Sequence, residues 1–283
     1  MNVFSTLKNP RTPIALTEAK YNRETSRSEP YVFNDGAAVK SYALCPACVN
    51  PVLLVNRTIP TTKAEILYAK HTGYSVNGLA EHNQQDYEEC PLHNPERFDS
   101  KSRRSSSKRN DEIRDALIHH AHLIIRTLET ASEAKFSDAV IEEMFRDFGA
   151  NRGFEYKAIS LYNLPFGFAY MTEGRDLFGC KVGQEMAHAI SEGSSGFYTD
   201  RYGKVCRKKD ARGTSIRFYF NNHRLGESSV GNDSIDMVVV EVETATSRSN
   251  ILAIKTLEYN SELFFNTYMR QERLRLLAFK YLK

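Results

Sequence analysis

The sequence predicts an α+β protein with an N-terminal zinc-knuckle module, a short helical middle and an antiparallel β-rich C-terminal domain closed by a helix. Two turns of metal-ligand residues lie in the first third of the 283-residue chain. Apolar residues at helical spacing follow them, and short β-branched and aromatic runs separated by turn residues fill the rest. We expect a zinc-binding module with an N-terminal arm over 1–99, a basic linker or loop over 100–110, and an α+β domain over 111–283.

Composition places the chain among globular proteins, with 41% hydrophobic and 26% charged residues. A net charge of +3 is too small to indicate nucleic-acid binding by itself, so the local distribution of charge matters more. We expect no membrane span, since no apolar run is long enough, and no secretory signal, since the N-terminus lacks an apolar core. The odd number of cysteines, five, fits a reduced, cytoplasmic setting better than a disulfide framework.

The first hundred residues divide into an arm and a metal-binding segment. Residues 1–40 are polar and show little periodicity, so we expect an extended arm or irregular packing there. Short apolar runs at 52–55 and 66–69 predict buried strands next to the metal ligands.

Two turns, Cys45–Cys48 (CPAC) and Cys90–His93 (CPLH), each hold two metal-ligand residues separated by two others, with a proline after the first. Zinc takes four tetrahedral ligands from Cys and His, and this spacing lets two ligands share one tight turn. We therefore predict a zinc site formed by Cys45, Cys48, Cys90 and His93. Four protein ligands leave no open position for water, so the zinc is expected to be structural.

Two histidines between the turns leave the fourth ligand open, because either His71 or His82 could replace His93. Without a fourth protein ligand, a site with a water-accessible position becomes possible. The alternative to a metal site is two unrelated cysteine turns.

The segment 41–98 resembles the zinc-finger head of CoiA-like competence proteins. Those proteins carry a CPxC turn followed shortly by Pro-Val, and the matching residues here are Cys45–Cys48 and Pro51–Val52. The resemblance implies a DNA-handling context. It does not extend to the second half of the chain, which lacks the nuclease core that follows in those proteins.

Helical spacing predicts two helices in the middle of the chain. Apolar residues over 113–128 recur every three or four positions, and Asn110 is suited to cap the start of that helix. Ser137 is the equivalent cap for a second helix, whose apolar stripe covers 140–148.

From residue 154 the pattern changes to aromatic and β-branched runs separated by Gly, Asn, Asp and Ser, which predicts a mostly antiparallel sheet. One helix near 184–191 interrupts it, and an amphipathic helix over 261–282 closes the domain. The predicted strands cover 156–171, 196–206, 215–220, 235–242 and 251–257.

Two basic segments are the candidate contact surfaces. Residues 100–110 hold five Lys or Arg and no acid, and 201–212 is basic with interleaved tyrosine. Cations contact phosphates and tyrosines stack on bases, so both segments are candidates for binding nucleic acid or an acidic partner. A solvated linker and an ordinary exposed hairpin are the alternatives. The predicted contact residues are Arg103, Arg104, Lys108, Arg109, Arg201, Tyr202, Lys204, Arg207, Lys208 and Lys209.

Catalytic motifs are weak, and we expect no catalytic residues. A metal-dependent nuclease would need to use Asp236, Glu241 and Glu243, but Glu243 stands where such sites have lysine. Lys255, on the next predicted strand, would have to supply that lysine. Arg114 and His119 match the short pattern of HEPN-like ribonucleases, which are helical bundles.

The sequence therefore predicts a non-enzymatic, zinc-stabilised binding protein that engages nucleic acid or a nucleoprotein complex. By analogy, the profile fits a phage or mobile-element accessory protein that inhibits a host defence complex. The alternatives are a metal-dependent nuclease, a HEPN-like ribonuclease, and a pure protein–protein interaction module. We expect no membrane partner, and a homo-oligomer formed through the C-terminal helix is an open possibility.

Overall fold

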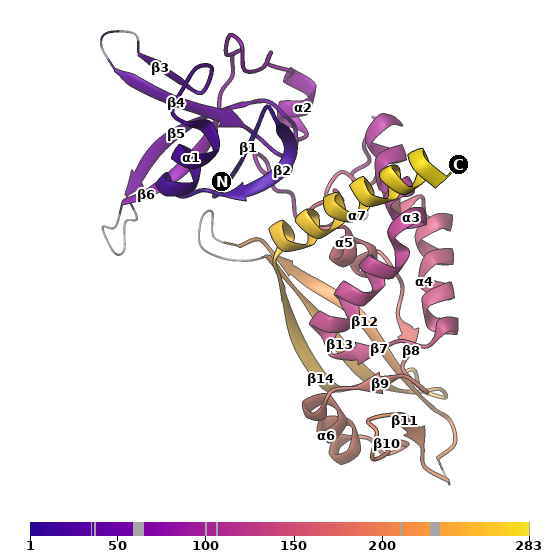
Figure 1. Cartoon of the computed structure of the whole chain (residues 1–283). Coiled ribbons are helices and arrows are strands. Elements are labelled where there is room, and N and C mark those ends of the chain that lie inside the picture. Colours follow the sequence, from indigo (N-terminus) through magenta and orange to yellow (C-terminus); the bar gives the residue numbers. More distant parts are fainter. Residues whose placement is uncertain are drawn as a thin grey trace. The chain divides into compact units, whose positions relative to one another are not determined.

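The computed structural model (Figure 1) describes residues 1–34, 36, 38–58, 65–99, 101–105, 107–209, 211–226 and 233–282. The chain forms two compact units, one containing residues 1–96 and 261–282 and the other 97–225 and 233–260. Helices and antiparallel sheets make up both, so the α+β prediction is confirmed. Among the described helices, none combines the length and the apolar character needed to cross a membrane.

The first unit is built on an antiparallel sheet with strand order β2-β1-β4-β5-β6, in which β3 also pairs with β4. Two short helices, α1 (Glu18–Thr25) and α2 (Gln84–Glu88), accompany the sheet. The strands are β1 (Val3–Thr6), β2 (Asn9–Ala15), β3 (Val32–Asn34), β4 (Val39–Leu44), β5 (Pro51–Thr58) and β6 (Glu65–His71).

Strands β1, β2 and β3 and helix α1 all lie within the first forty residues, so the prediction of an extended arm or irregular packing there is wrong. Val3 and Phe4 are buried on β1, which pairs with both β2 and β4. Tyr21 on α1 donates its hydroxyl to the carbonyls of Tyr31 and Tyr42, at 3.0 and 2.9 Å, and so fixes α1 to the sheet. The strands here are too short for a period-two pattern to stand out from a polar background.

The second unit contains an antiparallel sheet of order β14-β13-β12-β8. Its long strands are β12 (Thr214–Arg224), β13 (Asp233–Glu243) and β14 (Ser249–Tyr259), and β8 (Arg175–Asp176) is a short edge strand. Ribbons β7 (Ala134–Lys135) with β9 (Lys181–Val182) and β10 (Phe197–Thr199) with β11 (Val205–Arg207) complete the strands of the described residues.

Helices α3 (Ser107–Ser132), α4 (Asp138–Ala150) and α5 (Leu164–Tyr170) lie along this sheet, and α6 (Gln184–Gly193) lies beside the β10–β11 ribbon (Figure 1). The predicted strand over 156–171 is wrong, because α5 occupies its second half. Residues 164–169 are all buried, so the helix has a continuous apolar sequence that resembles a buried strand. Pro165 in its first turn is the local signal for a helix start.

The predicted segment boundaries change in two places. Helix α7 (Ser261–Leu282) contacts β2 and groups with the first unit, although the sequence placed it as the closing helix of the second domain. Helix α3 begins at Ser107, before the predicted cap Asn110, so the end of the predicted basic linker is helical.

Candidate metal centre and basic surfaces

Cys45, Cys48, His71 and Cys90 form a buried cluster in the first unit, with one ligand atom of each within 4.8 Å of all the others. Cys45 Sγ lies 3.7 Å from Cys90 Sγ. His71 Nε2 lies 3.4 Å from Cys48 Sγ and 3.5 Å from Cys90 Sγ. A disulfide needs about 2.05 Å between sulfurs, so these are free thiols.

The distances match those of a tetrahedral metal site. With metal–sulfur bonds of about 2.3 Å and metal–nitrogen bonds of about 2.05 Å, tetrahedral angles place two sulfurs about 3.8 Å apart and a sulfur and a nitrogen about 3.6 Å apart. The cluster therefore has the donor set and the spacing to hold a metal ion such as zinc with four protein ligands.

Three separate elements bring the ligands together. Cys45 follows β4, and its turn is closed by hydrogen bonds from the Cys45 N–H to the Asn50 carbonyl, 2.9 Å, and from the Val49 N–H to the Cys45 carbonyl, 2.8 Å. Val49 has a φ of +62°, a left-handed conformation that is costly for a β-branched residue, and it lies next to Cys48. The turn brings the Cys45 and Cys48 sulfurs within 4.8 Å of each other.

His71 and Cys90 reach the cluster through neighbouring structure. His71 ends β6 and pairs with Val52, which lies just after the first turn on β5. Cys90 follows α2, and its N–H donates to the Tyr87 carbonyl at 3.3 Å. The backbone N–H of Leu92 hydrogen-bonds to the Cys90 sulfur, as expected of a turn that stabilises a bound thiolate.

The ionisation of the three buried cysteine thiols in this cluster is favoured by a bound cation. Burial raises the pKa of the Cys45 thiol well above its usual value. Hydrogen bonds with Cys45 and then Cys90 lower the pKa of the Cys48 thiol. Three neighbouring buried sulfurs therefore do not all ionise easily on their own, whereas a bound divalent cation offsets their charge and favours the thiolate at each.

Three of the four predicted ligands are brought together here, and the fourth atom is supplied by His71 instead of His93. His93 is half-buried, and its ring centroid lies 4.0 Å from that of Tyr87 and 5.0 Å from that of His71. The other alternative, His82, hydrogen-bonds through Nε2 to Gln84 Oε1 at 3.0 Å. The Tyr87 and His93 rings thus pack against the His71 imidazole instead of joining the cluster.

In the first basic segment, Arg103 and Arg104 make hydrogen bonds within the second unit itself. Arg104 is 6% exposed, and its Nη2 donates to the carbonyls of Lys157 and Ile159 at 2.8 and 2.6 Å. Arg103 donates to the carbonyls of Asn151 and Arg152 and lies over the Tyr156 ring, 4.1 Å from its centroid. These contacts argue against the predicted role of Arg103 and Arg104 in binding a partner, because both guanidiniums hold backbone carbonyls of their own unit.

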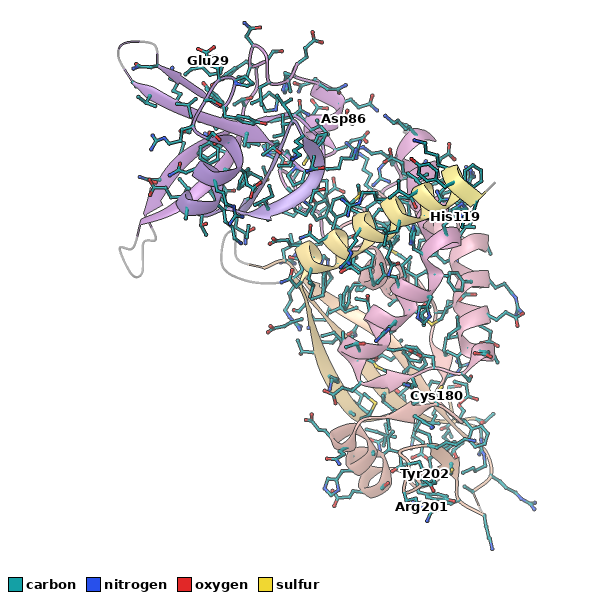
Figure 2. The ribbon with its side chains drawn as sticks, in the orientation of Figure 1. Glu29, Asp86, His119, Cys180, Arg201 and Tyr202 are labelled. Atoms are coloured by element: carbon teal, nitrogen blue, oxygen red, sulfur yellow. The ribbon has the colours of Figure 1, made fainter. Side chains whose placement is uncertain are left out.

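Of the remaining predicted contacts in this segment, Lys108 is exposed and Arg109 half-buried in the first turn of α3. The second basic segment is different, since it contains the turn of the β10–β11 ribbon, strand β11 and residues after it. Figure 2 shows Arg201 and Tyr202 together at the end of this ribbon. Arg201, Tyr202, Lys204 and Lys209 are exposed. Arg207 donates to the Thr214 carbonyl at 2.8 Å, and Lys208 Nζ to the Ser194 carbonyl at 2.7 Å.

The acidic residues considered for a nuclease are engaged in structural contacts. Asp236 accepts a two-pronged pair of hydrogen bonds from Arg224, at 2.6 and 2.9 Å, and further bonds from Asn222 and Thr256. Glu241 accepts from the backbone N–H groups of Ser195 and Gly196 at 2.9 and 2.7 Å.

These carboxylates do not converge. Asp236 and Glu241 are five residues apart on one strand, so their side chains point to opposite faces of the sheet. Glu243 accepts from Thr246, and Lys255, on the next strand, pairs with Glu133 at 2.8 Å. The contacts explain all four residues without a catalytic metal.

Asp236 is expected to make the protein acid-sensitive. The Arg224 hydrogen bonds lower the Asp236 pKa below its ordinary value, so its contribution to stability is present above the unfolded-state pKa of about 3.9 and is lost as pH falls below it. Urea unfolding should show that Arg224→Met is less stable than the native protein at pH 7, and that this difference shrinks below about pH 4. A difference that stays constant down to about pH 2 would refute this assignment.

The ribonuclease candidates lie on α3. Arg114 pairs with Asp111 at 2.8 Å and lies over the Phe154 ring, 5.9 Å from its centroid, while His119 is exposed. The neighbouring His120 is buried where the helix departs from helical geometry, with φ −125° and ψ 23°. Within the described residues, Arg114 is thus engaged with an acid and an aromatic ring of its own unit.

The chain matches no protein-family model, no curated protein and no solved structure. Its function is therefore inferred from the residues and their geometry.

Proposed function

We propose that the protein is a non-catalytic nucleic-acid-binding protein whose first unit is stabilised by a structural zinc ion and whose second unit contacts phosphates and bases through the β10–β11 ribbon. The observation that carries the binding proposal is the concentration of exposed cations and aromatic rings on that ribbon. Residues 197–209 contain five Lys or Arg and one acid, in a chain of net charge +3.

Zinc is the metal that best fits the cluster. Three thiolates and one imidazole form a soft donor set, typical of structural zinc sites, whereas magnesium and calcium prefer oxygen ligands. All four ligands are buried, so little room remains for a substrate or an activated water. The expected role of the zinc is to hold the β4–β5 turn, the end of β6 and the segment after α2 together.

The ribbon turn offers charge and ring surface in one place. Tyr202 is 64% exposed and Tyr198 41%, and the Arg201 guanidinium lies 4.6 Å from the Tyr202 ring centroid. Asp200 is used within the turn, because its carboxylate accepts from the backbone N–H groups of Tyr202 and Lys204 at 2.8 and 2.9 Å. Exposed tyrosines flanked by cations bind single strands by stacking on bases and contacting phosphates.

The backbone of the ribbon supports this surface. Gly203 has a φ of +74°, and a Cβ there would lie 2.6 Å from the Val182 carbonyl oxygen, so only glycine fits the turn without a shift. Arg207 also lies over the Phe197 ring, 4.7 Å from its centroid, which fixes the base of the ribbon. The exposed cations are thus presented on an ordered support.

Charge reversal on the ribbon should abolish most nucleic-acid binding. We expect Arg201→Glu/Lys204→Glu to weaken binding of a single-stranded oligonucleotide at least about tenfold, and Tyr202→Ala about tenfold, as measured by fluorescence anisotropy. Native affinity should fall steeply between about 50 and 200 mM salt.

The matched control is Arg270→Glu/Arg273→Glu, which makes the same change of net charge on exposed residues of the first unit. It should leave oligonucleotide affinity near the native value. No detectable binding by the native protein at low salt, or equal binding by the ribbon variants, would refute nucleic-acid binding and favour a pure protein–protein module. A role against a host defence complex stays a prediction by analogy.

A further inference from the structure

A groove in the first unit runs between α7 and the β1–β2 hairpin, with a volume of about 630 Å³. Its α7 side extends from Asn266 to Lys280 and its other side is formed by residues 8–12 and Val49. The volume is in the usual range of ligand sites, about 300–1,000 Å³, and the α7 side is about 21 Å long at 1.5 Å per residue. An elongated ligand therefore fits it better than a compact one.

The rim of the groove is cationic. Five of its lining residues are Lys or Arg, and no ion pair to a carboxylate is found for any of them among the described residues: Lys8, Arg11, Arg270, Arg273 and Lys280. Glu272 is the single acid among the described lining residues, and it already receives two hydrogen bonds from Arg275, at 2.8 and 2.7 Å. The charge of the groove is thus complementary to a ligand that carries several negative charges.

The floor of the groove is aliphatic. Its described residues are Met269, Leu276, Leu277, Pro10 and Val49, and no aromatic residue is among them. Leu276 and Leu277 are 53% and 45% exposed, which is unusual for neighbouring leucines in a folded unit. Beside them on α7, Leu274 and Tyr281 are 51% and 71% exposed and continue the apolar surface.

We propose that this groove binds an acidic amphipathic helix of a protein partner, with apolar side chains on the aliphatic floor and carboxylates against the cationic rim. Helix-in-groove recognition uses this combination of an apolar stripe and complementary charge. The site is separate from the β10–β11 ribbon, so the proposal does not depend on nucleic-acid binding.

Other occupants fit less well. Nucleic acid would find phosphate contacts at the rim, but it has no aliphatic side chains to cover the floor formed by Met269, Leu276 and Leu277. A second copy of the chain docking through the same groove would bring two cationic rims together. A flat membrane surface does not enter a groove that lies between a helix and a hairpin.

The test uses the full-length protein and an 18-residue peptide of Leu and Glu, with Leu at helical i, i+3, i+4 and i+7 spacing. We expect saturable binding in fluorescence anisotropy, and binding at least about tenfold weaker for the same peptide with Lys in place of Glu. Arg270→Glu/Arg273→Glu should weaken binding of the acidic peptide at least about tenfold. Leu277→Asn should weaken it about fivefold with no change in charge.

The control is Arg201→Glu/Lys204→Glu, which changes the ribbon and should bind the peptide like the native protein. All substituted residues are exposed or lie at the groove surface, and circular dichroism checks that each variant is folded. The proposal is overturned if the acidic peptide does not saturate, or if both groove variants bind it as tightly as the native protein does. It is also overturned if phosphatidylserine vesicles bind more tightly than the peptide through the same arginines, or if these variants dissociate a dimer of the native protein.

Discussion

His71→Ala is expected to unfold much of the first unit while the second unit stays folded. Structural zinc ions contribute about 10 kcal/mol or more to folding, and a typical domain is stable by only about 5–15 kcal/mol. The proposed site joins the β4–β5 turn, the end of β6 and the segment after α2 through one buried cluster. Hydrogen exchange should therefore show lost protection in β4, β5 and β6 and retained protection in β12, β13 and β14.

His93→Ala is the matched control, because it removes an imidazole that packs against His71 without joining the cluster. We expect it to cost about 1 kcal/mol from lost ring packing, far less than the loss of a ligand. Equal loss of protection in the two variants would contradict the assignment of His71 as the fourth ligand. A chelator added to the native protein should reproduce the His71→Ala pattern.

Arg104→Met is expected to destabilise the second unit by about 3 kcal/mol. The substitution keeps most of the aliphatic volume but leaves the carbonyls of Lys157 and Ile159 without their buried donor, and each unsatisfied group costs about 1–3 kcal/mol. Urea unfolding of the full-length protein measures the change.

Lys101→Met is the control for Arg104→Met, because Lys101 is an exposed cation of the same segment. It should change stability by less than about 0.5 kcal/mol. If Arg104→Met instead leaves stability unchanged and weakens oligonucleotide binding, Arg104 is a nucleic-acid contact, as the sequence first predicted.

The metal cluster shows which ligands can be predicted from their spacing along the sequence and which cannot. Ligand pairs separated by two residues identify Cys45, Cys48 and Cys90, because ligands on one tight turn leave a local pattern. His71 leaves no such pattern, since it arrives through the pairing of β6 with β5. Its register opposite Val52, four residues after Cys48, is the signal that would have favoured it over His93.

Burial explains why the sequence did not predict helix α5 or the structural contacts of Arg104. The α5 helix is surrounded by the core, so no polar face marks its helical period. Arg104 lies in a run of cations and serines typical of a linker, and nothing local indicates the carbonyls of 157 and 159 that it binds. The α+β class was predictable because the long strands β12 to β14 and helices α3 and α4 carry their own periodic patterns.

The metal content of purified full-length variants tests the central claim, a four-ligand zinc site at Cys45, Cys48, His71 and Cys90. Native mass spectrometry should find one zinc ion per chain in the native protein and in His93→Ala, and none in His71→Ala or Cys90→Ser. Zinc retained by His71→Ala and lost from His93→Ala would contradict the ligand set, and no zinc in the native protein would contradict the site itself.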